Sequence, residues 1–403
     1  MADTPLIALD NAVIFTGDAF VEGHALLLKD GKVLDIVASG RIPAAAETTP
    51  CPDRILAPAY IDCQVNGGGN VSLNNTPTPE AARAIAEAHA RCGTTRLLPT
   101  CITDKVETMT AAIAAVATAR RACPHILGIH LEGPHLATAR RGVHRADALR
   151  DLTEADMALY RPQDGATMLV TLAPERATPE QIHRLRHQGV IVSLGHTGAD
   201  AAMIGKALAA GATGFTHLFN GMGGLSARDP AVAGAALDDR DSWCGIIADG
   251  HHVAPSMIRL AHRAKPQGKL FLVSDSLPPA ASATPLPFKL YDETITVEGA
   301  HCKTQEGRFA GSVLTLAEAV KYCIATVGLA PEEALRMASA YPAAFLGLDR
   351  TFGKLLPTYT ADILALDHAF TPQSVWADGQ EMLAARKANR RHEQAESLPT
   401  THR

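Results

Sequence analysis

Four side chains of this sequence combine residue types and positions that suit hydrolytic chemistry. Glu132, His196 and His217 each end a short apolar run, in "HILGIHLE", "VIVSLGHT" and "ATGFTHLF". Two imidazoles and one carboxylate are a common ligand set of catalytic zinc, which keeps a further position open for water. Water bound to such a cation ionises near pH ~7 and becomes a nucleophile. The three residues therefore predict a catalytic metal site.

Asp275 ends another apolar run, "LFLVSDS". A carboxylate beside the metal can take a proton from water and return it to a leaving group, so Asp275 is the candidate acid and base. The alternative is an N-cap for a following helix. The next residues, "SLPPAAS", contain adjacent prolines and make a poor helix, which favours the catalytic interpretation. The chain has no GxSxG elbow and no phosphate-binding P-loop motif.

The stretch "APAYIDCQVNGGGNVSLNN", residues 57–75, predicts a strand that runs into a glycine-rich turn. Many metal hydrolases carry His-x-His at such a place. Here Gln64 and Asn66 occupy the two positions, and amides bind metals poorly. This raises the question of whether the protein has lost its metal or keeps one elsewhere.

The candidate residues can meet only if the segments that precede them lie side by side. From residue 57, short runs of Val, Ile and Leu alternate with helical patterns such as "PEQIHRLRHQG". About eight such repeats occur, the number that closes a (β/α)8 barrel, whose active site lies at the carboxyl ends of its strands. The residues expected there are Asn66, Thr100, Glu132, Glu175, His196, His217, the turn 249–252 and Asp275. A lone histidine at a strand end is more often structural, but polar residues at several strand ends favour one shared site.

Both ends of the chain predict short antiparallel strands. "KDGK" near the N-terminus is a hairpin signal, because Asp-Gly suits the positive φ angles of a tight turn. We therefore predict an α/β fold, a (β/α)8 TIM-like barrel with a small β-sandwich domain built from both chain ends. The expected divisions are 1–56 and 351–390 for the sandwich, 57–350 for the barrel and 391–403 for a polar tail.

Composition narrows the partners of this chain. The 403 residues carry a net charge of −5, with no basic stripe and only 4% aromatics, which argues against nucleic acid and favours a small molecule. Neither a signal peptide nor a membrane-length apolar run occurs in the sequence. Its eight cysteines include no CxxC pair, and several lie in apolar runs, as buried thiols do. We predict a reduced, cytoplasmic protein that binds no membrane.

The ordered motifs "GIHLEGPHL", "SLGHTGAD", "FTHLFNGMGGL", "GIIADGHHV", "LFLVSDS" and "GRFAGSVLT" resemble the N-acetylglucosamine-6-phosphate deacetylases of the amidohydrolase superfamily. The resemblance extends from about residue 10 to residue 385. It implies hydrolysis of the acetamide of N-acetyl-D-glucosamine 6-phosphate, a small phosphosugar, to D-glucosamine 6-phosphate and acetate, a reaction of amino-sugar catabolism.

The resemblance also implies roles for individual residues. Glu132, His196 and His217 match the metal ligands, and Asp275 matches the catalytic acid and base. His144, in "RRGVH", matches a histidine near the substrate that could polarise the acetyl carbonyl. The positions that match substrate-binding residues are Val143, Asn220, Gly221, Arg228, His252, Phe309, Ala310 and Gly311.

The family contains His-x-His members and Gln-x-Asn members, and "IDCQVNGGG" resembles the second kind. These are expected to hold one divalent metal per subunit, with Gln64 and Asn66 filling the second position by hydrogen bonding. Zinc is the first candidate, and iron, manganese and cobalt suit the same donors. The resemblance thus answers the question above, because the metal is expected at Glu132, His196 and His217.

Arg228 lies in the glycine-rich turn "GMGGLSARD" and could supply a fixed charge for a phosphate. Spacing alone favours a solvated surface arginine. In relatives this arginine can come from the neighbouring subunit, so the resemblance implies a homodimer.

Three positions depart from the family pattern, His135, Gly221 and Ser276, and we expect them to reshape the acyl or sugar pocket. Alternative substrates are N-acetylgalactosamine 6-phosphate and other N-acyl or cyclic amides. Hydrolysis of a phosphate ester is a further alternative. A non-catalytic binding barrel is the alternative from another class.

Overall fold

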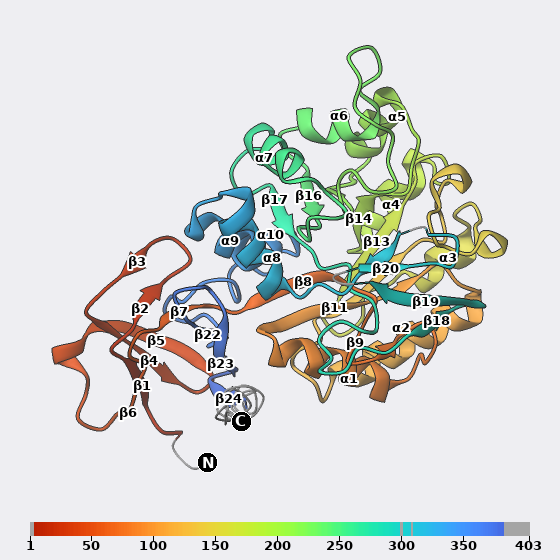
Figure 1. The fold of residues 1–403 in the computed structure, drawn as a ribbon. Helices are drawn as coiled ribbons and strands as arrows, with labels where there is room; N and C mark the ends of the chain where they lie inside the picture. The colour runs from red at the N-terminus through yellow and green to blue at the C-terminus, as the bar shows by residue number, and fades with distance from the viewer. Residues whose placement is uncertain (1–3, 299–300, 308, 383–403) are drawn as a thin grey trace, which may run out of the picture.

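The computed structural model describes residues 4–298, 301–307 and 309–382 (Figure 1). The predicted polar tail, 391–403, lies outside this range. The chain forms a large α/β part and a smaller β part, which lie side by side in Figure 1.

The large part is built on an eight-stranded parallel sheet in the order β17-β16-β15-β14-β13-β12-β11-β8. These strands coincide with the Val-, Ile- and Leu-rich runs, and all are largely buried, as parallel strands covered by helices must be. Their bounds are β8 Tyr60–Val65, β11 Thr94–Ile102, β12 Gly128–Glu132, β13 Thr167–Leu172, β14 Ile191–Leu194, β15 Gly214–Phe215, β16 Trp243–Ile246 and β17 Leu270–Leu272.

The sheet closes where β17 returns to β8. The backbone N–H of Asp275 donates to the carbonyl of Gln64 at 3.0 Å. The buried carboxylate of Asp62 accepts from the backbone N–H of Ser274 at 3.3 Å. The barrel is therefore closed by the same residues that are expected to do its chemistry.

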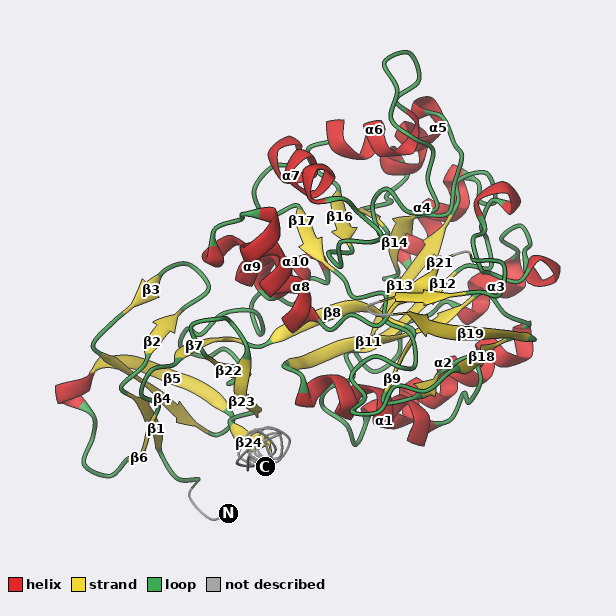
Figure 2. Cartoon of the chain, in the orientation of Figure 1, coloured by secondary structure: helices red, strands yellow, loops and turns green. Residues whose placement is uncertain are grey.

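Helices surround this sheet (Figure 2). Several begin where the sequence supplies a cap; Thr178, for example, forms a capping box with Gln181. The α-helices are α1 Pro79–Arg91, α2 Val106–Arg120, α3 Glu154–Leu159, α4 Pro179–His187, α5 Ala201–Ala209, α6 Ala231–Asp238, α7 Pro255–Ala264, α8 Leu316–Tyr322, α9 Pro331–Ala338 and α10 Ala340–Phe345. Short 3₁₀ segments are Ser39–Arg41, Thr138–Arg140 and Ala146–Ala148, and Cys323–Val327 is a π-helical turn.

The smaller part contains two sheets, ordered β5-β4-β1-β6 and β24-β23-β22-β7-β2-β3. The second sheet joins both chain ends, because β22 pairs antiparallel with β7. The strands are β1 Ile7–Asp10, β2 Val13–Phe15, β3 Phe20–Val21, β4 His24–Lys29, β5 Lys32–Ala38, β6 Glu47–Pro50, β7 Ile55–Pro58, β22 Ile363–Leu366, β23 Pro372–Ala377 and β24 Gln380–Met382. The "KDGK" hairpin links β4 to β5, with positive φ at Asp30 and Gly31 as predicted.

Side chains of both sheets share one core, to which Leu9 and Leu26 contribute from one sheet and Leu56, Ile363 and Trp376 from the other. This arrangement confirms the predicted fold class, a barrel with a sandwich built from both chain ends. The divisions at residues 56 and 350 stay a prediction, and β7 continues through Pro58.

A further four-stranded sheet, absent from the sequence prediction, lies between β17 and α8 in the chain. Its strands are β18 Phe288–Leu290, β19 Glu293–Glu298, β20 His301–Lys303 and β21 Phe309–Ser312, and we call it the flap sheet. The flap sheet joins the barrel at Ser312, which bridges to Ser276. A short ribbon, β9 Gly67–Gly68 with β10 Val71–Ser72, follows β8.

All eight cysteines are unpaired, and all but Cys92 are buried, as predicted for small apolar side chains. Among the described helices, none combines the length and the apolar character needed to cross a bilayer.

One buried ion pair joins the barrel to the sandwich. Arg96 of β11 donates to Asp362 at 2.6 and 2.9 Å and to Asp378 at 2.7 Å. The side chains of Arg96 and Asp362 are only 4% and 8% exposed. Both carboxylates belong to the sandwich end of the chain, so one guanidinium fixes the two parts together.

We predict that Arg96→Met lowers the free energy of unfolding by about 3–5 kcal/mol, because Asp362 then stays buried without a counter-charge. The matched control is Arg121→Met, whose ion pair with Asp164 is 73% and 72% exposed and should contribute little. Denaturant melts of both variants test this, and equal midpoints would contradict it.

Candidate active site

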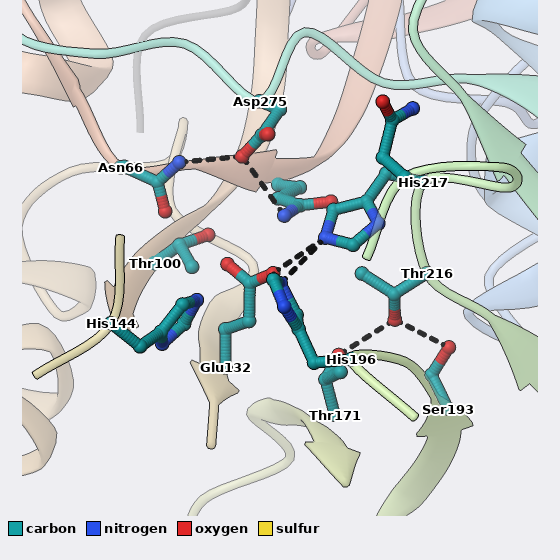
Figure 3. A network of polar contacts seen from close by, with 12 residues as sticks. Asn66, Thr100, Glu132, His144, Thr171, Ser193, His196, Thr216, His217 and Asp275 are labelled. Atoms are coloured by element: carbon teal, nitrogen blue, oxygen red, sulfur yellow. Dashed lines mark hydrogen bonds and ion pairs between the residues drawn. The ribbon is translucent and has the colours of Figure 1, made fainter. Parts of the chain in front are cut away.

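The three predicted metal donors meet at the carboxyl ends of barrel strands. Glu132 is the last residue of β12, while His196 and His217 follow β14 and β15. Their exposed fractions are 2%, 8% and 3%, so all three side chains lie below the surface. Figure 3 shows them pointing toward one another.

The donor atoms of these residues form a tight triangle. Glu132 Oε1 lies 3.1 Å from His196 Nε2 and 2.8 Å from His217 Nε2, and the two Nε2 atoms are 3.0 Å apart. The Nδ1–H of His196 donates to the carbonyl of Arg140 at 2.8 Å, which leaves the Nε2 lone pair facing the triangle. Three electron-rich atoms so close need a shared cation. Ligands of a tetrahedral zinc are about 3.3 Å apart, so this set fits a divalent metal.

The backbone is strained at this site. His196, His217 and Asp275 have φ angles of 48°, 34° and 50°, in the left-handed region that favours glycine. Such residues cost about 1–3 kcal/mol each and persist where the surrounding structure holds them. The strain turns each side chain from its strand end toward the common centre.

At the donor residues, burial and neighbouring charge shift the pKa values in opposite directions. Burial lowers the pKa of His217, but the hydrogen bond and charge of Glu132 outweigh it and raise that pKa to about 9. Burial raises the pKa of Glu132, and the two imidazoles hold it well below its ordinary range. Without a metal, a proton is therefore the cation that Glu132 and His217 share.

Asp275 lies beside the triangle and is oriented by the amides of Gln64, in β8, and of Asn66, just after it. Its Oδ1 accepts from Gln64 Nε2 at 2.9 Å and from Asn66 Nδ2 at 2.7 Å (Figure 3). Burial, followed by the nearby charge of Glu132, raises the pKa of Asp275 to about 6. A carboxyl group with that pKa can accept and return a proton near neutral pH. The residues after Asp275 form a β-bridge at Ser276 and then a turn, not a helix, so the N-cap interpretation does not hold.

His144 is also brought to the site. Its ring packs edge-on against His196, with centroids 4.5 Å apart. Burial, followed by the charge of His196, lowers the pKa of His144 to about 3, so the imidazole is neutral. A neutral imidazole can donate one hydrogen bond to a carbonyl oxygen or an oxyanion.

A cavity of about 340 Å³ opens above these groups. It exceeds the lower end of the range for small-ligand pockets. Of the predicted substrate-binding residues, those that line the cavity are Val143, Asn220, Gly221, His252, Ala310 and Gly311. The side chain of Phe309 lies outside the described part of the chain, although its backbone belongs to β21.

Arg228 is exposed and does not line the cavity of its own chain. Arg140, which was not predicted, does line the cavity, and it carries both a guanidinium and the carbonyl that orients His196. The only signal was its place in "ARRGVH", four residues before His144. Leu277 and Ile102 add apolar surface that sequence reasoning also missed.

Two departures from the family pattern do not reshape the pocket, contrary to our expectation. His135 is fully buried and bonds to the carbonyl of Arg150 and to the hydroxyl of Tyr160. Ser276 donates to the carbonyl of Gly67 at 3.1 Å, which ties the strand end after Asp275 to the turn after β8. Both are therefore structural.

Gly221 does line the cavity, and a Cβ added there would lie 2.8 Å from His196 Nδ1. The backbone at this position, with φ of +60°, also suits glycine. Gly221 therefore leaves the space in which the His196 ring is held.

Two predicted strand-end residues have structural roles instead. Glu175 accepts from Thr197 Oγ1 and from the backbone N–H of Gly198, which shapes the loop after His196. Thr100 belongs to a buried polar layer near the donors (Figure 3). In that layer the bonds His130–Thr171, Thr171–Thr216 and Thr216–Ser193 measure 2.7, 2.7 and 2.8 Å.

Comparison with known proteins places this geometry in a family. Residues 55–382 match the model of the amidohydrolase family. The N-acetylgalactosamine-6-phosphate deacetylase of Shewanella sp. (strain ANA-3) is 41% identical over 96% of this chain and 98% of its own. The mouse N-acetylglucosamine-6-phosphate deacetylase is 34% identical over 96% and 98%. The crystal structure of the Pasteurella multocida N-acetylglucosamine-6-phosphate deacetylase superposes with a TM-score of 0.90 at 31% identity, covering 94% and 99%.

We predict that metal binding at pH 7 releases about one proton, because His217, with a pKa of about 9 in the metal-free protein, must lose its proton to bind. Metal affinity should therefore rise as the pH increases toward 9. Calorimetric titration with zinc in buffers of different ionisation enthalpy measures the proton count. Water on the zinc would add to this count, since it ionises near pH ~7. No proton release at pH 7 would contradict the prediction.

Proposed function

Because the chain belongs to the amidohydrolase family, we propose that it hydrolyses the acetamide of an N-acetylhexosamine 6-phosphate to the amino sugar phosphate and acetate. The predicted substrate is N-acetylglucosamine 6-phosphate. The observation that carries the proposal is the donor triangle of Glu132, His196 and His217 beside Asp275, at the base of a cavity. This set of groups suits hydrolysis of an unactivated amide.

One divalent cation per subunit, zinc in the first place, is proposed at the donor triangle. When bound, it supplies a Lewis acid that acidifies water and stabilises negative charge on oxygen. Gln64 and Asn66 support a single site, because both direct N–H groups at Asp275 and because amides bind metals poorly.

The proton is carried by Asp275 in this proposal. As a carboxylate it takes the proton of the attacking water, and as an acid it gives that proton to the departing amine nitrogen. The amine needs this proton because an amide anion is too basic to leave. His144 donates a hydrogen bond to the acetyl carbonyl oxygen, where negative charge develops as the water attacks.

The sugar phosphate is assigned to the residues around the cavity. Asn220 and Gly221 line the cavity, with Gly221 against the ring of His196, and the β21 segment, Phe309 to Gly311, is proposed to cover the sugar. His252 and Arg140 are proposed to face the phosphate. Arg228 is proposed to reach it from the second subunit of a homodimer, since it is exposed in its own chain.

The unpaired cysteines support a cytoplasmic location, because thiols stay reduced in the cytoplasm. The galactosamine epimer is the second candidate substrate, because the Shewanella relative, the most similar of the three proteins named above, bears that name. The two sugars differ at one hydroxyl.

The proposed function predicts acetate release from the N-acetylhexosamine 6-phosphates by the zinc-loaded protein. The unphosphorylated sugars should react far more slowly, since the phosphate anchors the substrate in the cavity. Coupled acetate assays on both epimers, with and without phosphate, give four values of kcat/KM. Equal rates with and without phosphate would discard the phosphate site but keep the hydrolytic one.

The same assay separates the other candidates. Release of inorganic phosphate instead of acetate would indicate a phosphate-ester hydrolase. No release of either product by metal-loaded protein would point to another amide or to a binding role.

We predict that Asp275→Asn abolishes turnover while zinc binding persists, because an amide cannot carry the proton but leaves the donor triangle intact. The folded state should not lose stability. Asp275 has a raised pKa, so its contribution to stability is present at low pH and is lost as the pH rises through about 6. A neutral side chain avoids that loss at pH 7. Acetate assays, zinc titration and thermal melts test the variant, and turnover by the Asp275→Asn enzyme would refute the assignment.

A further inference from the structure

Two chain segments, residues 103–104 and 144–145, are bonded to each other at the edge of the cavity. Thr103, directly after β11, bonds to His144 through its backbone N–H and its hydroxyl. The next residues of the two segments, Asp104 and Arg145, form an ion pair at 3.4 Å. His144 therefore has its orientation set by a neighbouring segment and not only by its own loop.

The contacts of Thr103 decide which nitrogen of His144 carries the proton. The N–H of Thr103 donates to His144 Nδ1 at 3.3 Å, and its hydroxyl lies 2.8 Å from the same atom. An atom that accepts from a backbone N–H carries no hydrogen. In the neutral ring the hydrogen then sits on Nε2, which gives His144 its donor on the other edge of the ring.

Tyr291 of the flap sheet contacts both of these segments, through Thr103 and Arg145. Its hydroxyl donates to the carbonyl of Thr103 at 2.6 Å. Its ring lies under the guanidinium of Arg145, 5.3 Å from the centroid. Tyr291 itself sits in the turn between β18 and β19, with a φ of 56°.

The flap sheet also contributes to the cavity. Ala310 and Gly311 of β21 line it, and Val143, next to His144, packs on the same apolar cluster as Tyr291. The sheet that lines the cavity is thus linked to His144 through Thr103, which bonds to both Tyr291 and His144.

We propose that Tyr291 is a positioning residue that acts through Thr103 to keep His144 in the tautomer with hydrogen on Nε2. The role of His144 rests on the proposed function, whereas its tautomer does not. Loss of the Tyr291 hydroxyl releases the Thr103 carbonyl and allows the Thr103–His144 bonds to loosen. His144 then divides between two tautomers, only one of which donates into the cavity.

Tyr291→Phe tests this, because it removes one hydroxyl and keeps the ring under Arg145. We expect kcat to fall about fivefold, the worth of one hydrogen bond, with KM within about twofold. In protein labelled with 15N-histidine, the His144 Nδ1 signal should move from its unprotonated position toward the protonated one. A His144→Gln variant assigns that signal.

Variants of Thr103 give the conservative comparison. Thr103→Ser keeps both donors and should retain kcat and the histidine spectrum. Thr103→Val keeps the N–H but loses the hydroxyl, and it should shift both readouts in the direction of Tyr291→Phe.

Tyr359→Phe is the matched control, since Tyr359 also donates to a backbone carbonyl, that of Asp349 at 2.7 Å, outside the cavity. It should change neither kcat nor the His144 signal. An equal loss of kcat in the Tyr359→Phe control would overturn the proposal, as would an unchanged kcat in Tyr291→Phe. A fall in kcat with an unchanged His144 spectrum would also overturn it.

The two proposals fail separately. If wild-type protein hydrolyses no N-acetylhexosamine phosphate, the proposed function fails while the histidine spectra still decide the tautomer. If wild-type His144 carries its hydrogen on Nδ1, the positioning role fails even in an active deacetylase.

Discussion

The mutual repulsion of three electron-rich atoms is the constraint on which this structure depends. Glu132, His196 and His217 bring their donor atoms within 2.8–3.1 Å of one another in a buried place. Only a shared proton or metal makes that arrangement stable. The protein also accepts left-handed backbone at His196, His217 and Asp275 to hold it. A rigid barrel is the suitable support, because each strained residue follows a buried strand that has no freedom to relax.

The donor set could be predicted from the sequence because each member follows a short apolar run. Parallel strands place their carboxyl ends together, so Glu132, His196, His217 and Asp275 were expected at one mouth before any distance was known. The sandwich was predictable for a similar reason, since strand-like patterns occur near both chain ends and an Asp-Gly turn occurs near the N-terminus. Patterns of this kind can be recognised in the sequence because the residues that form them are close together in the chain.

Other features depend on contacts between distant segments, which local patterns do not indicate. Tyr291 lies 188 positions from Thr103, and nothing around either residue indicates their hydrogen bond. The flap sheet interrupts the βα rhythm with short polar strands, which resemble a loop in the sequence. His135 was expected at the pocket because its type departs from the family, but a substitution in a motif does not say which way the side chain points.

Charge balance at the cavity favours a second guanidinium for the phosphate, and Arg228 is its proposed source. A phosphate ester carries about −1.5 to −2 at neutral pH, and the cavity already contains two carboxylates, Glu132 and Asp275. Among the described lining residues, Arg140 is the one permanently charged cation. His196 and His217 are assigned to the metal, and His252 is hydrogen-bonded to Asp249. A second guanidinium from a neighbouring subunit would supply the remaining charge only in the assembled protein. Such an arrangement would keep an unpaired cation away from the metal donors of the free chain, and it would make phosphate recognition depend on assembly.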